Sequence, residues 1–204
     1  AKAIRAKGRV ACIGHGTAHR LGVDEEDINP PALVEALEAL RVHKSDYEIE
    51  AMAEATRRAA AGHLAIQNAF AQGDRDALSL QQHFLQASGQ DATETPYQNI
   101  VGLGVDAAVL HHRQYVRRDD AQSLLVDAGA RYAGYAADIT RTHAAANAPQ
   151  AIIDLVRLVE GVELQAAQEV RVGQPYEDLH AAVHHHLAEG LVALGLFKVS
   201  AEDA

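Results

Sequence analysis

The stretch from 124 to 143, LLVDAGARYAGYAADITRTH, carries two aspartates, Asp127 and Asp138, whose spacing suits metal or acid–base chemistry. The strand-forming residues LLV and IT near its two ends flank Ala133-Gly134, where a tight turn needs a residue that tolerates positive φ. This pattern predicts a β-hairpin.

The hairpin would place both carboxylates on one face. A two-residue turn puts Asp127 opposite Thr140, and Asp138 lies two positions from Thr140 on the same strand. The two aspartates are then diagonal neighbours, whereas a shift of one residue in the register would separate them.

Two carboxylates about 6 Å apart repel each other by about 3 kcal/mol at an effective dielectric constant of about 20. A shared proton would offset this repulsion, as in a carboxylate dyad, and so would a bridged pair of divalent cations. Ordinary solvation of both groups is the third alternative. The spacing alone leaves all three open.

Several blocks resemble, in order, the pita-bread metallopeptidase family, and among its members the bacterial proline dipeptidases (Xaa-Pro dipeptidases, prolidases). The blocks are HKSDYEIEAM, AAAGHLAI, TPYQNIVGLGVDAAVLHH and DAGARYAGYAADITRT, and the resemblance covers nearly the whole chain. It implies an α+β class and a truncated pita-bread (creatinase/aminopeptidase-like) fold, with helices packed on a mainly antiparallel sheet.

The resemblance also implies roles for single residues. Asp127 would bind one metal ion and Asp138 would bridge two ions, with manganese expected and cobalt or zinc as alternatives. The segment AAVLHH would supply an active-site histidine at His111, and Tyr97 would line the substrate pocket. Independently of the resemblance, the position of Thr140 on the aspartate face predicts a hydrogen bond from its hydroxyl to a metal-bound carboxylate.

Two positions depart from the family pattern. The residue after the active-site histidine is usually Tyr, but here it is His112, and Asp106 stands where the family usually has Asn. Because adjacent strand residues point to opposite faces, His112 leaves open which of the two histidines faces the site.

Other histidines are expected to be structural. His63 lies inside a predicted helix, where a packed or half-exposed role is the ordinary one. His180 and His184, together with His185 and His186, belong to another helix and are expected on a solvated face, since the glutamate of a zinc protease motif is absent.

The segments around the hairpin are mostly helical. Ser45 and Glu48 form a capping box for a long helix that closes near Gly73. Further helices are predicted at 76–87, 149–173 and 175–195, and a second hairpin is predicted at 97–112.

A domain boundary is predicted near Lys44. A short strand at 9–14 and a helix after Asn29 precede it, and in the family these resemble the tail of a separate domain. Residues 1–44 would be a remnant of an amino-terminal α/β domain, and 45–204 the first part of the catalytic domain, without its carboxy-terminal strands.

Composition narrows the class of partner. A formal net charge of -10 disfavours nucleic acid and anionic membranes, which both reward a basic surface. The sequence lacks an apolar run of the roughly 20 residues that a membrane helix needs. The single Cys12 fits a reducing compartment, so a cytoplasmic protein is expected.

The resemblance implies that the parent protein hydrolyses dipeptides with a carboxy-terminal proline, and that it is a homodimer. The remaining metal ligands, a histidine and two glutamates, would follow Ala204, so the fragment alone is expected to be inactive. An aminopeptidase P acting on longer Xaa-Pro peptides is the first alternative. A non-catalytic pita-bread module that binds proteins is the second.

Overall fold

The computed structural model describes residues 10–14, 16 and 22–200, and the chain divides into two compact units, Ala1–Glu50 and Ala51–Ala204. The first unit contains η2 (Glu25–Asp27), α3 (Pro31–Val42) and the start of α4. The strand predicted at 9–14 is wrong for its described residues, in which Cys12 makes one isolated parallel bridge with Ile28. Arg9 lies outside the described residues. That this unit is a domain remnant stays a prediction.

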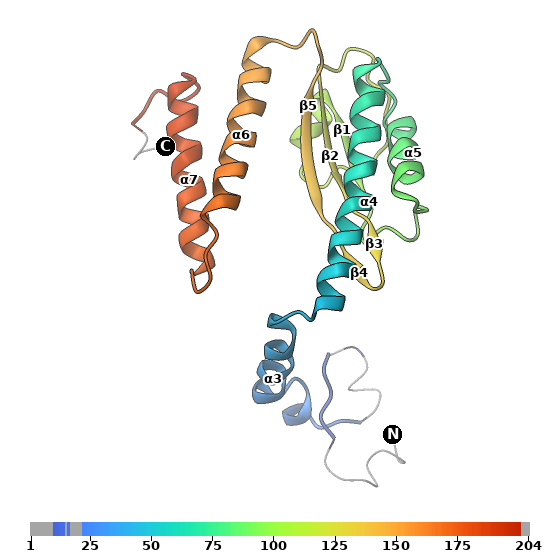
Figure 1. Ribbon diagram of the computed structural model, residues 1–204, viewed down its shortest axis with the longest axis vertical. Coiled ribbons are helices and arrows are strands. Elements are labelled where there is room, and N and C mark those ends of the chain that lie inside the picture. The colour runs from blue at the N-terminus through green and yellow to red at the C-terminus, as the bar shows by residue number, and fades with distance from the viewer. Residues whose placement is uncertain (1–9, 15, 17–21, 201–204) are drawn as a thin grey trace. The chain divides into compact units, whose positions relative to one another are not determined.

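The second unit is an α+β arrangement (Figure 1). Strands β1, β2 and β5 form an antiparallel sheet in the order β1-β2-β5, and the short strands β3 and β4 extend the β2–β5 hairpin. Helix α6 lies beside β5 and α7 lies beside α6. The elements are α4 (Asp46–Ala71), α5 (Ala77–Ser88), β1 (Ile100–Leu103), η3 (Gly104–Ala108), β2 (Ser123–Ala128), β3 (Arg131–Tyr132), β4 (Tyr135–Ala136), β5 (Ile139–Ala144), α6 (Gln150–Glu169) and α7 (Tyr176–Ala193).

The start of α4 is the predicted capping box. The Ser45 backbone N–H donates to Glu48 Oε2 at 2.7 Å, and the Glu48 N–H donates back to Ser45 Oγ at 3.4 Å. These bonds satisfy amide groups that a helix start leaves without partners. The helix ends at Ala71, close to the predicted end at Gly73.

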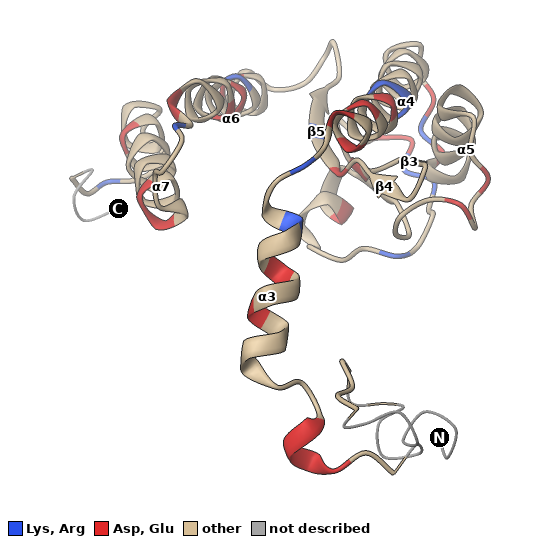
Figure 2. Cartoon of the chain, turned by 60° about the horizontal axis from the view of Figure 1, so that its bottom comes forward, with Lys and Arg blue, Asp and Glu red and all other residues tan. Residues whose placement is uncertain are grey.

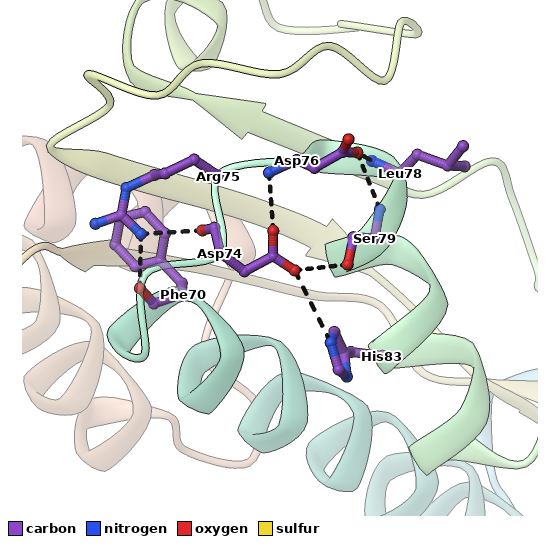
Figure 3. Close-up of polar contacts among 7 residues, drawn as sticks. All are labelled: Phe70, Asp74, Arg75, Asp76, Leu78, Ser79 and His83. Carbon is purple, nitrogen blue, oxygen red and sulfur yellow. Dashed lines mark hydrogen bonds and ion pairs between the residues drawn. The ribbon is translucent and has the colours of Figure 1, made fainter.

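A polar turn joins α4 to α5 (Figure 3). Asp76 caps α5 by accepting from the N–H groups of Leu78 and Ser79. Asp74 accepts from Ser79 Oγ at 2.6 Å and lies 3.9 Å from His83 Nε2. Since the serine proton points to the carboxylate and not to the histidine, this Ser–His–Asp set stabilises the turn and is not arranged as a nucleophilic triad.

The hydrophobic core lies between α4, α5 and one face of the sheet. Leu124, Val126 and Ala128 of β2 are buried at alternate positions, as the period of a strand requires. They pack with Phe70 and Phe84, which come from α4 and α5. Burying each large apolar side chain contributes about 1.5–3 kcal/mol, so this face fixes the position of the hairpin against the helices.

The predicted second hairpin is wrong. After β1, Gly104 adopts a φ of 55° and the chain enters η3 instead of a returning strand. The Asp106 carboxylate then receives two hydrogen bonds from the Arg118 guanidinium, at 2.9 and 2.8 Å, which hold the loop. The antiparallel partner of β1 is β2.

The last two helices occur where they are predicted, with different ends. Helix α6 ends at Glu169, before the predicted end at Gly173, and α7 ends at Ala193. Among the described residues no helix is both long and apolar enough to span a membrane. In Figure 2 acidic residues are seen on η2, α3, α4, α6 and α7, whereas α5 carries no charged residue.

Candidate metal centre

The central hairpin has the predicted turn and register. Ala133 and Gly134 both have positive φ, 48° and 86°, as a two-residue hairpin turn requires. Asp127 pairs with Thr140 across the β2–β5 ladder. The pairing around the turn continues the same register. Asp138 precedes Thr140 by two residues, so its side chain lies on the same face as that of Asp127. This face is opposite to the one that α4 covers.

The absence of a side chain at Gly129 allows Tyr97 to approach this face. A Cβ atom on Gly129 would lie 2.1 Å from the Ala137 carbonyl oxygen and 3.1 Å from Tyr97 Cε1. Only glycine leaves room for these neighbours. The Tyr97 ring therefore lies over the hairpin, and its hydroxyl donates to Asp138 Oδ1 at 2.6 Å.

The electrostatics connect Tyr97 with both carboxylates. Burial raises the pKa of the Tyr97 hydroxyl, and hydrogen bonding with Asp138 and Asp127 raises it further, as do their negative charges. Tyr97 is therefore a neutral donor at physiological pH. The structure thus brings together three of the predicted site residues: Tyr97, Asp127 and Asp138.

One carboxylate oxygen in this group has no partner. Asp127 Oδ1 is buried, and it accepts no hydrogen bond within the described part of the chain. A buried carboxylate oxygen without a donor is costly, and a cation offsets that cost. Carboxylate oxygens are the ligands that hard divalent cations prefer, so the residues present fit part of a metal site.

His111 follows η3, which lies over the aspartate face of the sheet. A Cβ atom on Gly102, which pairs with Leu125 on that face, would lie 3.0 Å from the Ala107 backbone. His111 itself is exposed in the turn after η3. The neighbouring His112 is half-buried and its Nε2 atom has no hydrogen bond partner among the described residues. The structure does not bring either histidine into hydrogen bonding with the aspartates over the residues it describes.

Thr140 is exposed on β5, directly opposite Asp127. Its backbone carbonyl accepts from Arg141, but no hydrogen bond within residues 22–200 joins its hydroxyl to a carboxylate. Its support of a metal-bound carboxylate stays a prediction.

A buried amide pair supports the strand end beside Asp127. Asn99 and Gln81 are almost fully buried, and Asn99 Nδ2 donates to Gln81 Oε1 at 3.2 Å. Asn99 Oδ1 accepts from the Gly129 N–H at 3.4 Å. This link ties the segment that carries Tyr97 to the strand that carries Asp127.

Two histidines on the α4 side of the hairpin were not among the predicted site residues. His63 of α4 is 7% exposed, and its Nε2 atom lies 3.1 Å from the Ala128 carbonyl oxygen. Burial lowers the pKa of His63 and also that of His143 on β5. The contact joins residues 65 positions apart, so local sequence patterns gave no signal for it.

The histidines of α7 lie apart from these contacts. His185 and His186 approach Glu189 and Glu169, each at 3.4 Å, and the rings of His180 and His184 are 4.2 Å apart. Over the residues that the structure describes, no group of three or more His, Cys, Asp or Glu side chains is arranged to hold a metal ion.

Comparisons with known proteins agree with this geometry. Residues 27–200 match metallopeptidase family M24. The chain is 42% identical to the Xaa-Pro dipeptidase of Marinobacter nauticus over 180 residues, and 36% identical to that of Photorhabdus laumondii over 201 residues. These matches cover 87% and 97% of the chain but only 42% and 45% of the relatives. The chain thus spans less than half the length of these curated relatives.

Solved structures of Escherichia coli aminopeptidase P share the fold. A zinc-substituted form in complex with product matches with a TM-score of 0.73, and a form with the inhibitor Pro-Leu matches with a TM-score of 0.74. Each is 26% identical and covers 80% of this chain and 38% of its own. The pita-bread arrangement is thereby confirmed, and the chain belongs to metallopeptidase family M24.

Proposed function

We propose that the protein containing this chain is a metal-dependent hydrolase that cleaves the bond between a residue and the following proline in a dipeptide. The observation that carries the proposal is the Asp127–Asp138 pair, with one buried oxygen of Asp127 lacking a partner. The relatives at 36–42% identity over most of the chain are Xaa-Pro dipeptidases, which supports the choice of substrate.

In this proposal Asp127 and Asp138 hold divalent cations on the open face of the hairpin, which is the face opposite α4. Such cations polarise a carbonyl group and lower the pKa of bound water. Two carboxylates supply fewer oxygens than two ions need, so the proposal requires further ligands. The family resemblance implies a histidine and two glutamates, in the part of the relatives' length that this chain does not span.

The other site residues act on the substrate. Tyr97 is held neutral beside the carboxylates, orients Asp138 through its hydrogen bond, and lines the pocket. His111, exposed after η3, donates a proton toward the charge that develops on the scissile carbonyl oxygen. Thr140 supports the Asp127 carboxylate from the neighbouring strand.

The finer properties follow the resemblance. Manganese is the proposed metal, with cobalt or zinc as substitutes, and the protein is proposed to be a cytoplasmic homodimer. The boundary near Lys44 between a domain remnant and the catalytic part belongs to the same proposal.

The test is hydrolysis of Ala-Pro by the full-length protein, before and after removal of metal with a chelator. Activity should disappear with the chelator and return with Mn²⁺. Asp138→Asn should abolish it, whereas Asp119→Asn, which changes an exposed surface ion pair, should not. Chelator-resistant hydrolysis, or full activity of Asp138→Asn, would contradict the proposal.

A second candidate is favoured by the structural neighbours, which are aminopeptidase P. An enzyme of that kind would remove the first residue from longer peptides that begin with Xaa-Pro. Comparing kcat/KM for Ala-Pro with that for a longer Ala-Pro-led peptide separates the two. Preference for the longer peptide would select aminopeptidase P.

A further inference from the structure

His63 lies behind the aspartate pair, on the covered face of the hairpin. It projects from α4 next to Phe84, whose ring meets the imidazole edge-on at 5.5 Å between centroids. Small residues, Ala55 and Ala59, allow α4 to approach the hairpin closely, where they pack with Ala130 and Ala137. The imidazole is thus held against the Phe84 ring, close to the hairpin backbone.

The hydrogen bond of His63 has a defined direction. A backbone carbonyl can only accept, so the 3.1 Å contact with Ala128 means that Nε2 carries the proton and donates it. Ala128 pairs with Ile139 across the ladder. The hydrogen bond of His63 therefore holds a residue pair that joins the two strands of the hairpin.

These two strand positions separate the candidate metal ligands. Ala128 and Ile139 pair across the ladder, Asp127 immediately precedes Ala128, and Asp138 immediately precedes Ile139. The Ala128–Ile139 pair therefore lies between the two aspartates along the hairpin. His63 binds this pair from one face of the sheet while the carboxylates project from the other.

Packing alone does not account for a histidine here. Its Nδ1 atom is buried without a partner among the described residues, which costs free energy that Leu or Met would not incur. The Ala128 carbonyl also belongs to the ladder and does not depend on a side chain for its hydrogen bonding. What the imidazole adds beyond packing is a hydrogen bond that fixes the position of the hairpin backbone.

We propose that His63 is a positioning residue, which fixes the Ala128–Ile139 pair and thereby sets the separation of the Asp127 and Asp138 carboxylates for metal binding. The inference rests on the proposed function, because it requires that the two aspartates bind divalent cations. It assigns a role to a residue that touches neither metal nor substrate. Groups that hydrogen-bond to metal ligands commonly change metal affinity by about 10-fold to 100-fold when they are removed, and for His63, which acts through the backbone, we expect the lower end of that range.

The experiment compares two variants of the full-length protein. His63→Met fills a similar volume with an apolar side chain and removes the hydrogen bond donor. His63→Gln places an N–H at a similar distance from the backbone. Mn²⁺ binding is measured by calorimetry, the Co²⁺ absorption spectrum reports metal geometry, and thermal unfolding of the metal-free protein reports stability.

His63→Met should bind Mn²⁺ about 10-fold or more weakly, with an altered Co²⁺ spectrum, and His63→Gln should restore most of the affinity. In Ala-Pro hydrolysis, kcat should fall more than KM rises. Phe84→Leu is the matched control, since it weakens packing around His63 without removing the hydrogen bond. It should lower the unfolding temperature and leave Mn²⁺ affinity unchanged.

Wild-type affinity in a folded His63→Met protein would overturn the inference and leave the proposed function intact. The inference would also be overturned if the loss of Mn²⁺ affinity in His63→Met, His63→Gln and Phe84→Leu simply followed the loss of stability in each variant. If His63→Met does not fold, His63→Leu, which also lacks the donor, takes its place, and it must then bind Mn²⁺ about 10-fold or more weakly than Phe84→Leu does. A wild-type protein that binds no Mn²⁺ would instead contradict the proposed function itself.

Discussion

The two faces of the β2–β5 hairpin differ in the kind of side chain that they carry. The face toward α4 carries Leu124 and Val126, which are fully buried, and its polar contact is the hydrogen bond from His63. The opposite face carries Asp127 and Asp138, where one buried oxygen has no partner. The alternation of a single hairpin thus separates a face that packs against α4 from the face that we propose binds metal.

The packed face, which lies toward α4, determines the geometry of the open face, which carries the aspartates. Two side chains that hold the hairpin from behind contact its backbone near Asp127: His63 at Ala128, the next residue, and Asn99 at Gly129, two residues further along than Asp127. Because the sheet is one residue thick, a displacement on the packed face moves the carboxylates as well. Variants on each face separate the two contributions experimentally.

The largest effect is expected at Gly129, where both faces would be disrupted together. In Gly129→Ala the new Cβ would overlap the Ala137 carbonyl oxygen and press on Tyr97. We expect a loss of about 3 kcal/mol or more in the free energy of unfolding, because backbone must move. Urea unfolding of the full-length protein measures this loss.

Gly161→Ala in α6 is the matched control, since nothing lies within 4 Å of the added methyl group. It should raise stability by about 0.5–1 kcal/mol, as removal of a helical glycine does. Equal stability of Gly129→Ala and wild type would contradict the close contact of Gly129 with the Ala137 carbonyl oxygen and the Tyr97 ring.

A smaller effect is expected for the open face alone. Tyr97→Phe removes the hydroxyl that donates to Asp138, so the metal-free protein should lose about 1–2 kcal/mol of stability. The loss should be smaller with saturating Mn²⁺, which neutralises the carboxylates. Unfolding in chelator and in Mn²⁺ gives the two values.

Tyr132→Phe changes a hydroxyl on the same hairpin, where the Arg58 guanidinium covers the ring and does not depend on the hydroxyl group. It should leave stability unchanged under both conditions. If Tyr97→Phe behaves in the same way, the hydrogen bond to Asp138 does not stabilise the hairpin.

The smallest effect is a pH dependence that belongs to the packed face. Because burial lowers the pKa of His63 and His143, the unfolded chain binds protons at these sites at a higher pH than the folded chain does. The free energy of unfolding should therefore fall as the pH falls below about 6.5, the ordinary pKa of histidine. The fall should end once the pH is below the pKa values in the folded state.

Urea unfolding of the metal-free protein between pH 7.5 and 5, roughly the range of histidine titration, tests this dependence. Replacement of both histidines by Gln should flatten the curve over that range. An unchanged slope in the double variant would assign the dependence to other groups.

The sequence predicted the open face better than the packed one. The turn at Ala133-Gly134 and the alternation around Asp127 are local patterns, and they fixed the register of the hairpin correctly. The capping box at Ser45 is equally local. These features depend on residues within a few positions of one another, for which propensity and spacing are informative.

Contacts between distant segments were not predictable in the same way. The segment after β1 looked like a returning strand, but Gly104 and the ion pair of Asp106 with Arg118 make it a short 3-10 helix. The bond between His63 and Ala128 depends on how α4 packs on the sheet. Tertiary packing decides such contacts, and a single sequence carries little information about it.

The central claim, that Asp127 and Asp138 together hold divalent cations, is tested most directly by the stoichiometry of Mn²⁺ binding. Calorimetric titration of the metal-free, full-length protein should give two ions per chain for wild type and for Asp119→Asn. Asp138→Asn, which loses the proposed bridging carboxylate, should bind no more than one. Two tightly bound ions in Asp138→Asn, or none in wild type, would contradict the account.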